Sequence, residues 1–189
     1  DEWKLVWSDE FNDQQIDLSN WTFDIGTGAP SFKEYGISSP YFTPENFPND
    51  NFSVRWEGQI KIDQSSTYTF YTISDDGVRL FINGKNIINN WQAQPATENK
   101  GTITLKGNNT YPIVIEYFED SGGEAMILGW ESENFNKKLI TNENLVTKDG
   151  KPGLKGTYYR NKTLKYSEKK KPLVRIDKEL NWVTGGGWG

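Results

Sequence analysis

Two adjacent acidic residues, Asp75 and Asp76, lie between two apolar runs of the sequence and are followed by Gly77. Neighbouring negative charges repel each other, and Asp is depleted in strands. A hard cation would reconcile the pair, because calcium takes about six to eight oxygen ligands in irregular geometry. The same residues are also typical of a tight turn, in which Asp accepts backbone hydrogen bonds and Gly takes a positive φ. From these residues alone, a metal site and an ordinary turn both stay open.

The composition restricts the chemistry that the chain can perform. It contains no His and no Cys, so a thiolate zinc site, a disulfide and a His-based triad are excluded. The formal net charge of -5 argues against nucleic acid as a partner. No apolar segment is long enough to span a membrane. The basic run Lys169-Lys170-Lys171 is expected to be part of a solvated loop.

Apolar residues alternate with a period of two between residues 51 and 131. This pattern, with polar turns between short runs, predicts an all-β protein, an antiparallel sandwich or barrel. Asn83-Gly84 predicts a type I′ hairpin, and two further hairpins are expected across residues 106–109 and 119–124. Trp56 and Trp130 alternate inward on their strands and are expected in the core.

The pattern relaxes after residue 131. Residues 134–142 are expected to form a loop, and residues 147–153 have the composition of a linker. Strands are expected to return at residues 154–159 and 173–176.

Residues 52–131 resemble the PA14 family, named after a segment of anthrax protective antigen. The resemblance is carried by Phe52-Ser53-Val54-Arg55-Trp56, Ser74-Asp75-Asp76-Gly77-Val78-Arg79-Leu80, Asn83-Gly84-Lys85, Asn90-Trp91, Ile115-Glu116-Tyr117-Phe118-Glu119 and Gly122-Gly123. It implies an antiparallel β-sandwich of the jelly-roll type. Two pieces that open a family member, here residues 153–159 and 175–182, come last. The sequence is therefore interpreted as circularly permuted, with residues 147–153 joining the former termini.

The two ends of the chain resemble a different family. Residues 3–11 and 21–28 are similar to the opening of family-sixteen glycoside hydrolases, in particular laminarinase-like endo-β-1,3-glucanases, and residues 186–189 are similar to a Gly-Gly-Trp-Gly that follows soon after. The expected division is a hydrolase fragment at 1–28, an inserted permuted PA14-like domain at 29–182 and a returning hydrolase loop at 183–189. In an alternative interpretation, the C-terminal tail is the start of a second, tandem copy of the same sequence.

No pair of catalytic carboxylates is expected in this chain. Retaining hydrolysis needs two carboxyl groups about 5 Å apart, and the resembled hydrolases carry theirs in a Glu-x-Asp-x-x-Glu strand. The run from Glu119 to Glu124 has the outer acids, but Ser121 replaces the required Asp and two glycines indicate a turn. We therefore expect a non-catalytic chain that belongs to a hydrolase parent.

The PA14 resemblance implies a binding site at the Asp pair. In some sugar-binding members, two such residues are joined by a cis peptide and bind calcium, which in turn coordinates sugar hydroxyls. A second loop of the site, here residues 119–123, comes from another hairpin. The candidate metal ligands are Asp75, Asp76, Asp120, Ser121 and Gly123. The candidate carbohydrate-binding residues are Asp75, Asp76, Trp91, Glu119 and Asp120. For Trp91 the alternative is packing in the core. Tyr35, Tyr41 and Phe42 could stack on glucan, and their alternative is packing over the sandwich. Trp188 is expected near the hydrolase cleft.

The function expected from these observations is a non-catalytic carbohydrate-binding module of a secreted or cell-surface β-glucan hydrolase. Its partners would be a polysaccharide, expected to be a β-glucan, and the remainder of the hydrolase, with the chain itself a monomer. The alternative is an insert that shapes access to the hydrolase cleft, or contacts another protein, without binding sugar.

Overall fold

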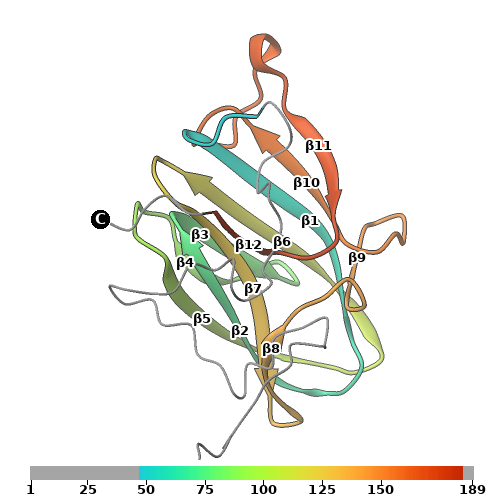
Figure 1. Cartoon of the computed structure of the whole chain (residues 1–189). Helices are drawn as coiled ribbons and strands as arrows, with labels where there is room; N and C mark the ends of the chain where they lie inside the picture. Colours follow the sequence, from blue (N-terminus) through green and yellow to red (C-terminus); the bar gives the residue numbers. More distant parts are fainter. Residues whose placement is uncertain (1–46, 185–189) are drawn as a thin grey trace, which may run out of the picture.

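The computed structural model describes residues 47–184 of the chain, which form two antiparallel sheets packed face to face (Figure 1). The expected all-β sandwich is confirmed. Residues 1–46 and 185–189 lie outside the described part, and with them the hydrolase-like residues 1–28 and 186–189 and the aromatic residues Tyr35, Tyr41, Phe42 and Trp188. Val183 and Thr184, expected in the returning hydrolase loop, pair with the smaller sheet as the end of its first strand. Within residues 47–184, no helix is both long and apolar enough to cross a membrane.

The larger sheet has seven strands, in the spatial order β11 (Leu173–Asp177), β10 (Leu154–Tyr159), β1 (Phe52–Ile62), β6 (Asn109–Glu119), β3 (Gly77–Ile82) and β4 (Lys85–Asn90), with β9 (Leu145–Val146) pairing with β1. The smaller sheet has five, in the order β12 (Asn181–Thr184), β7 (Glu124–Ser132), β2 (Ser66–Asp75) and β5 (Thr97–Leu105), with β8 (Phe135–Leu139) pairing with β7. A short 3-10 helix, η2 (Glu168–Lys170), precedes β11.

The core between the sheets is rich in aromatic rings, because alternate residues of each strand point inward. Trp56 of β1 is fully buried and stacks on Trp182 of β12, with ring centroids 5.9 Å apart. Tyr158 of β10 packs edge-on against Trp56. Trp130 of β7 is buried beside Tyr68, so the predicted core positions of Trp56 and Trp130 are confirmed.

The hairpin predicted at Asn83-Gly84 joins β3 to β4. Both turn residues have positive φ, 51° at Asn83 and 76° at Gly84, as a type I′ turn requires. The Asn83 N–H also donates to the Pro112 carbonyl at 2.8 Å, which fixes the turn against β6.

The other two predicted hairpins are wrong, because the strands on either side belong to different sheets. β5 lies in the smaller sheet and β6 in the larger one, and the connection from β6 to β7 crosses back in the opposite direction. The turn at residues 106–108 is held by the β1–β2 crossover instead: the Gly107 N–H donates to Ser65 Oγ at 2.9 Å and the Asn108 N–H to the Asp63 carbonyl. Turn residues indicate where a chain reverses and do not specify which strand it pairs with next.

Two segments predicted to be irregular are ordered by pairing. Residues 134–142 are not simply a loop, because β8 pairs with β7, and Phe135 packs on Trp130 with ring centroids 5.3 Å apart. Residues 147–153 form a hydrogen-bonded turn rather than an extended linker. The Thr147 N–H donates to the Lys151 carbonyl, and the Gly153 N–H donates to the Leu145 carbonyl, both at 2.8 Å. The signal for β8 in the sequence is a period-two pattern too short to stand out.

Candidate functional site

The candidate site lies where two connections cross between the sheets at the same end of the sandwich. Asp75 ends β2, and Asp76 lies in the crossing to β3. Glu119 ends β6, at the start of the second crossing, which leads to β7. Phe52, the first residue of β1, is opposite Glu119 in the register. The strand order therefore brings together two acidic segments that are about forty residues apart in sequence.

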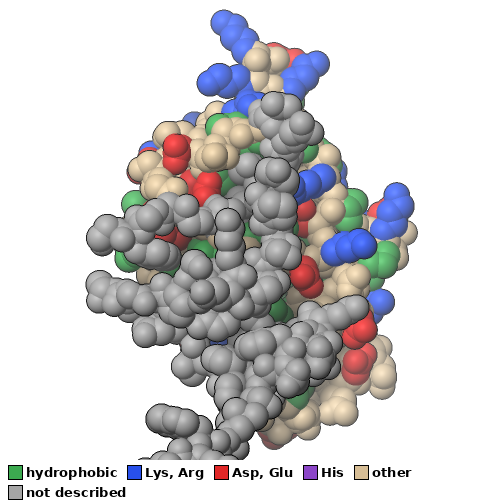
Figure 2. Space-filling view, in the orientation of Figure 1, with side chains coloured by type: hydrophobic (Ala, Val, Ile, Leu, Met, Phe, Trp, Pro, Cys, Tyr) green, Lys and Arg blue, Asp and Glu red, His purple; other side chains and the backbone are tan. Residues whose placement is uncertain are grey.

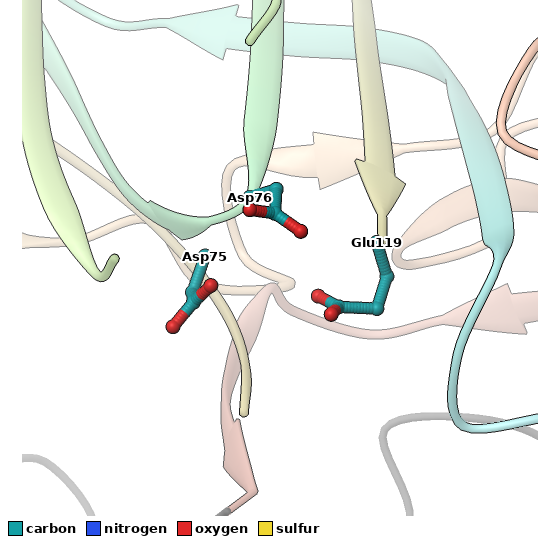
Figure 3. A group of neighbouring side chains, drawn as sticks. All are labelled: Asp75, Asp76 and Glu119. Atoms are coloured by element: carbon teal, nitrogen blue, oxygen red, sulfur yellow. The ribbon is translucent and has the colours of Figure 1, made fainter. Parts of the chain in front are cut away.

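Three carboxylates converge at this point. Asp75, Asp76 and Glu119 each offer an oxygen, and these oxygens lie within 4.8 Å of one another (Figure 3). Asp75 is partly exposed, Asp76 is 5% exposed and Glu119 is fully buried. This cluster of Asp75, Asp76 and Glu119, called the carboxylate cluster below, is open to solvent on the Asp75 side.

The backbone holds the Asp76 carboxylate in place. One oxygen accepts from the Gln94 N–H and the other from the Asp120 N–H, each at 2.8 Å. The Gln94 side chain donates to the carbonyls of Ser74 and Asp76, so the segment between β4 and β5 also braces the turn. The peptide bond between Asp75 and Asp76 is cis.

The buried Tyr117 hydroxyl connects the other two members of the carboxylate cluster. It lies within hydrogen-bonding distance of the Asp75 carbonyl oxygen and of Glu119 Oε2, the latter at 2.7 Å. A hydroxyl has one hydrogen. When Tyr117 donates to the Asp75 carbonyl, a proton on Glu119 is needed to complete the second bond.

Burial favours that proton. It raises the pKa of Glu119 to about 9, with the charges of Asp76 and Asp75 adding to the effect. The pKa of Asp75 is raised to about 7, again by burial first and then by the Asp76 charge. Both shifts follow from moving a carboxylate out of water and placing it beside like charge.

The donor set fits a hard cation. Two oxygens that ligate one calcium at about 2.4 Å can be at most about 5 Å apart, and the cluster oxygens meet that limit. Among the residues that the structure describes, Glu119 Oε1 is buried and has no hydrogen-bond partner. A buried carboxylate oxygen without a partner is costly, and a cation between the three side chains would remove that cost.

The remaining predicted residues of this loop lie around the carboxylate cluster. The Asp120 N–H binds Asp76, whereas the Asp120 carboxylate forms an ion pair with Lys162 at 2.5 Å. Ser121 is exposed and Gly123 is partly exposed in the same crossing. Metal ligation by Asp120, Ser121 and Gly123 stays a prediction.

Trp91 lies beside the site in a different environment. Its ring packs edge-on against Phe118, the neighbour of Glu119, with centroids 4.9 Å apart. The Arg79 guanidinium stacks 4.0 Å from the ring centroid, and Trp91 remains partly exposed. The ring therefore lies on the outer face of the larger sheet, where Arg79 points, and its role in sugar binding stays a prediction.

Three residues that shape the site were not anticipated from the sequence. Tyr117 could have been found, because it occupies an inward position two residues before Glu119 on the same alternating strand. Gln94 and Lys162 carry no local signal. Each reaches the site only through the fold, Gln94 from the β4–β5 connection and Lys162 from the β10–β11 connection.

Comparison with known proteins places this geometry in context. The model of the PA14 domain family matches residues 37–144. The chain is 34% identical over 166 residues to the anti-sigma-I factor RsgI3 of Acetivibrio thermocellus, covering 85% of this chain and 23% of that protein. It is 30% identical over 115 residues to the protective antigen of Bacillus anthracis, covering 58% of this chain and 14% of that protein.

Solved structures give a similar result. An anti-sigma factor domain-containing protein from Clostridium clariflavum superposes with a TM-score of 0.53 at 32% identity, covering 76% of this chain and 50% of that one. The chain spans less than a quarter of the length of the two curated relatives. The similarity therefore concerns one part of each relative.

Proposed function

The chain belongs to the PA14 domain family, a family of non-catalytic domains, and from this premise we propose that it binds carbohydrate through calcium held by the carboxylate cluster. The observation that carries the proposal is the convergence of Glu119 with Asp75 and Asp76, together with a buried Glu119 oxygen that has no hydrogen-bond partner within residues 47–184. The three acidic side chains converge with no basic residue in the cluster. A bound cation explains this arrangement better than the turn alone.

Each residue has a distinct part in this proposal. Asp75, Asp76 and Glu119 would hold the ion, and the crossing that contains Asp120, Ser121 and Gly123 would supply further oxygens. The bound ion would supply positive charge and open coordination positions for sugar hydroxyls. The backbone N–H groups of Gln94 and Asp120 orient the Asp76 carboxylate, and Tyr117 positions Glu119. The partly exposed Trp91 remains a candidate contact to the sugar, whereas the fully buried Glu119 would act on the sugar through the ion.

The test is calorimetric titration of the chain with calcium, followed by a glycan array and titration with laminarin in calcium or in chelator. We expect calcium to bind and to raise the melting temperature, and glycan binding to disappear in chelator. Asp76→Asn removes one ligand charge, so it should abolish calcium binding and, with it, the calcium-dependent binding of glycan. Glu57→Gln, a change of one acidic residue outside the cluster, is the matched control.

Two outcomes would contradict the proposal. Calcium that neither binds nor stabilises the chain would leave the Asp pair as an ordinary turn. Calcium binding without any glycan binding would favour the alternative function, an insert that shapes access to a neighbouring cleft or contacts another protein.

The longer protein served by this module has two candidate identities. The hydrolase-like segments at 1–28 and 183–189 support a secreted β-glucan hydrolase, with β-glucan as the ligand. The relative named an anti-sigma-I factor supports a longer regulatory protein in which this module senses a ligand. An extracellular or cell-surface location follows from either proposal, since polysaccharides are found there.

The proposed permutation is supported by strand pairing. The family model ends at residue 144, yet β10 pairs with β1 and β12 pairs with β7, so strands after that point extend both sheets. Both ends of the described segment also contact the connection between β6 and β7. Near the first end, the Asn51 N–H donates to the Asp120 carbonyl, and at the other end Thr184 pairs with Glu124. Neighbouring ends are what an inserted domain requires.

A further inference from the structure

The connection between β10 and β11 projects from the sandwich as a basic arm, defined here as residues 160–171. In Figure 1 it is the projection above β10 and β11, and Figure 2 shows Lys and Arg side chains around it. As the sequence predicts, the arm is solvated: Lys165, Lys169, Lys170 and Lys171 are all exposed. Tyr166, within the same arm, is 58% exposed.

The charge of the basic arm is opposite to that of the whole chain. The arm contains one acidic residue, Glu168, and six basic residues: Arg160, Lys162, Lys165, Lys169, Lys170 and Lys171. The whole chain has a formal charge of -5. Exposed like charges repel each other, so an anionic partner would relieve the repulsion within the arm.

The base of the arm is anchored beside the carboxylate cluster. Ser53 at the start of β1 is fully buried; its hydroxyl donates to the Asn161 carbonyl at 2.6 Å and accepts from the Leu164 N–H at 3.0 Å. Lys162 forms the ion pair with Asp120, whose N–H binds Asp76. A ligand at the carboxylate cluster would therefore lie next to the arm.

Four lysines of the arm have no acidic partner within residues 47–184. Lys165, Lys169, Lys170 and Lys171 take part in none of the ion pairs of this part of the chain. Glu168 accepts a hydrogen bond from the Tyr166 hydroxyl at 3.0 Å. The positive charge of the arm is thus available to a ligand.

We propose that the basic arm binds anionic groups of a polysaccharide, such as uronate carboxylates or sulfates, while the carboxylate cluster holds neighbouring hydroxyls. The inference rests on the proposed calcium-dependent glycan binding, and it replaces the neutral β-glucan named there with an acidic polysaccharide as the ligand class. The lysines of the arm contact charges along the polymer, and Lys162 stays with Asp120. Nucleic acid fits less well, because its dense phosphates would meet the three carboxylates at the base of the arm.

The test compares binding of short galacturonate oligosaccharides with their neutral methyl esters, in calcium and in chelator. The arm variant replaces Lys165, Lys169, Lys170 and Lys171 with Gln. The control variant replaces Lys61, Lys85, Lys106 and Lys148 with Gln, four exposed lysines away from the arm that change the net charge equally. Dextran sulfate against dextran tests sulfate as the anionic group, and a DNA oligonucleotide tests nucleic acid.

We expect the intact chain to prefer an acidic oligosaccharide to its neutral form, and the arm variant to bind the acidic form roughly tenfold more weakly, as expected for the loss of four exposed ion contacts. The control variant should keep most of its affinity. The inference fails if the two variants lose affinity equally, if neutral and acidic forms bind alike, or if DNA binds as tightly as the glycans. Chelator and Asp76→Asn separate the two proposals. If they leave binding of the acidic oligosaccharide intact while the arm variant weakens it, the calcium proposal fails and the arm stands. If they abolish binding while the two lysine variants bind equally well, the arm fails and the calcium proposal stands.

Discussion

At the scale of single residues, Glu119 explains why the site needs either a proton or a cation. Its side chain is fully buried, one oxygen is near the Tyr117 hydroxyl and the other has no partner in the described part of the chain, residues 47–184. Burial and the charges of Asp75 and Asp76 raise its pKa to about 9. A metal-free chain at neutral pH therefore keeps Glu119 protonated, whereas a bound cation would favour the ionised form.

The raised pKa predicts that the metal-free chain loses stability as pH rises. The unfolded chain releases the Glu119 proton near the ordinary glutamate pKa of 4.5, while the folded chain keeps it up to about 9, so folding becomes less favourable between these values. Glu119→Gln should remove most of this loss, on the order of a few kcal/mol. Thermal melts in chelator at pH 5 and pH 8.5 measure it, and parallel pH profiles for both proteins would contradict the assignment. Asp75→Asn should remove a smaller part of the stability loss, because the pKa of Asp75 is raised only to about 7.

At the scale of the strands, one buried acid ties the C-terminal segment to β1. Asp177 at the end of β11 accepts hydrogen bonds from Trp56 Nε1 at 2.7 Å, from the Tyr158 hydroxyl at 2.6 Å and from Arg175 Nε at 2.5 Å. These donors come from β1, β10 and β11. Since Asp177 is 4% exposed, the three strands share an interaction that water does not replace.

Asp177→Ala should destabilise the chain by about 3–5 kcal/mol, because it leaves the buried Trp56 and Tyr158 donors and the partly buried Arg175 cation without their acceptor. Asp177→Asn keeps an acceptor oxygen and should cost less. Urea unfolding followed by fluorescence measures both. A loss below about 1 kcal/mol for the alanine variant would show that Asp177 does not hold the strands together. Calcium binding should be unchanged in Asp177→Asn, since Asp177 lies outside the carboxylate cluster.

At the scale of the whole molecule, the sandwich depends on strands from beyond the region matched by the family model. Leu154, Tyr158, Leu180 and Trp182 all contribute buried side chains to the main core. They belong to the segment after residue 144, where that match ends. The folding unit is therefore longer than the matched region.

A chain that stops after Val146 should lose cooperative unfolding, because Tyr158 and Trp182 no longer cover Trp56 and β1 loses β10 as its neighbour. We expect dye binding to exposed apolar surface and a loss of near-UV circular dichroism. A chain that stops after Thr184 retains every described strand and is the control. A sharp thermal transition in the shorter chain would contradict this prediction.

The sequence by itself determined the local features of this protein. Period-two alternation predicted the strands between residues 51 and 131 and the buried positions of Trp56 and Trp130, and Asn83-Gly84 predicted its hairpin, because each depends on residues that are neighbours in the chain. The Asp75-Asp76 pair was recognised as a candidate cation site for the same reason.

Only the tertiary structure decided which distant residues meet. The turns at 106–109 and 119–124 resemble hairpins in sequence, and their role as crossings between sheets depends on which strands compete for pairing. The second of these crossings places Glu119 beside Asp75 and Asp76, and the fold brings Gln94 and Lys162 to the site from two other connections. Such contacts depend on the pairing of the whole sheet, and a local pattern holds no information on them.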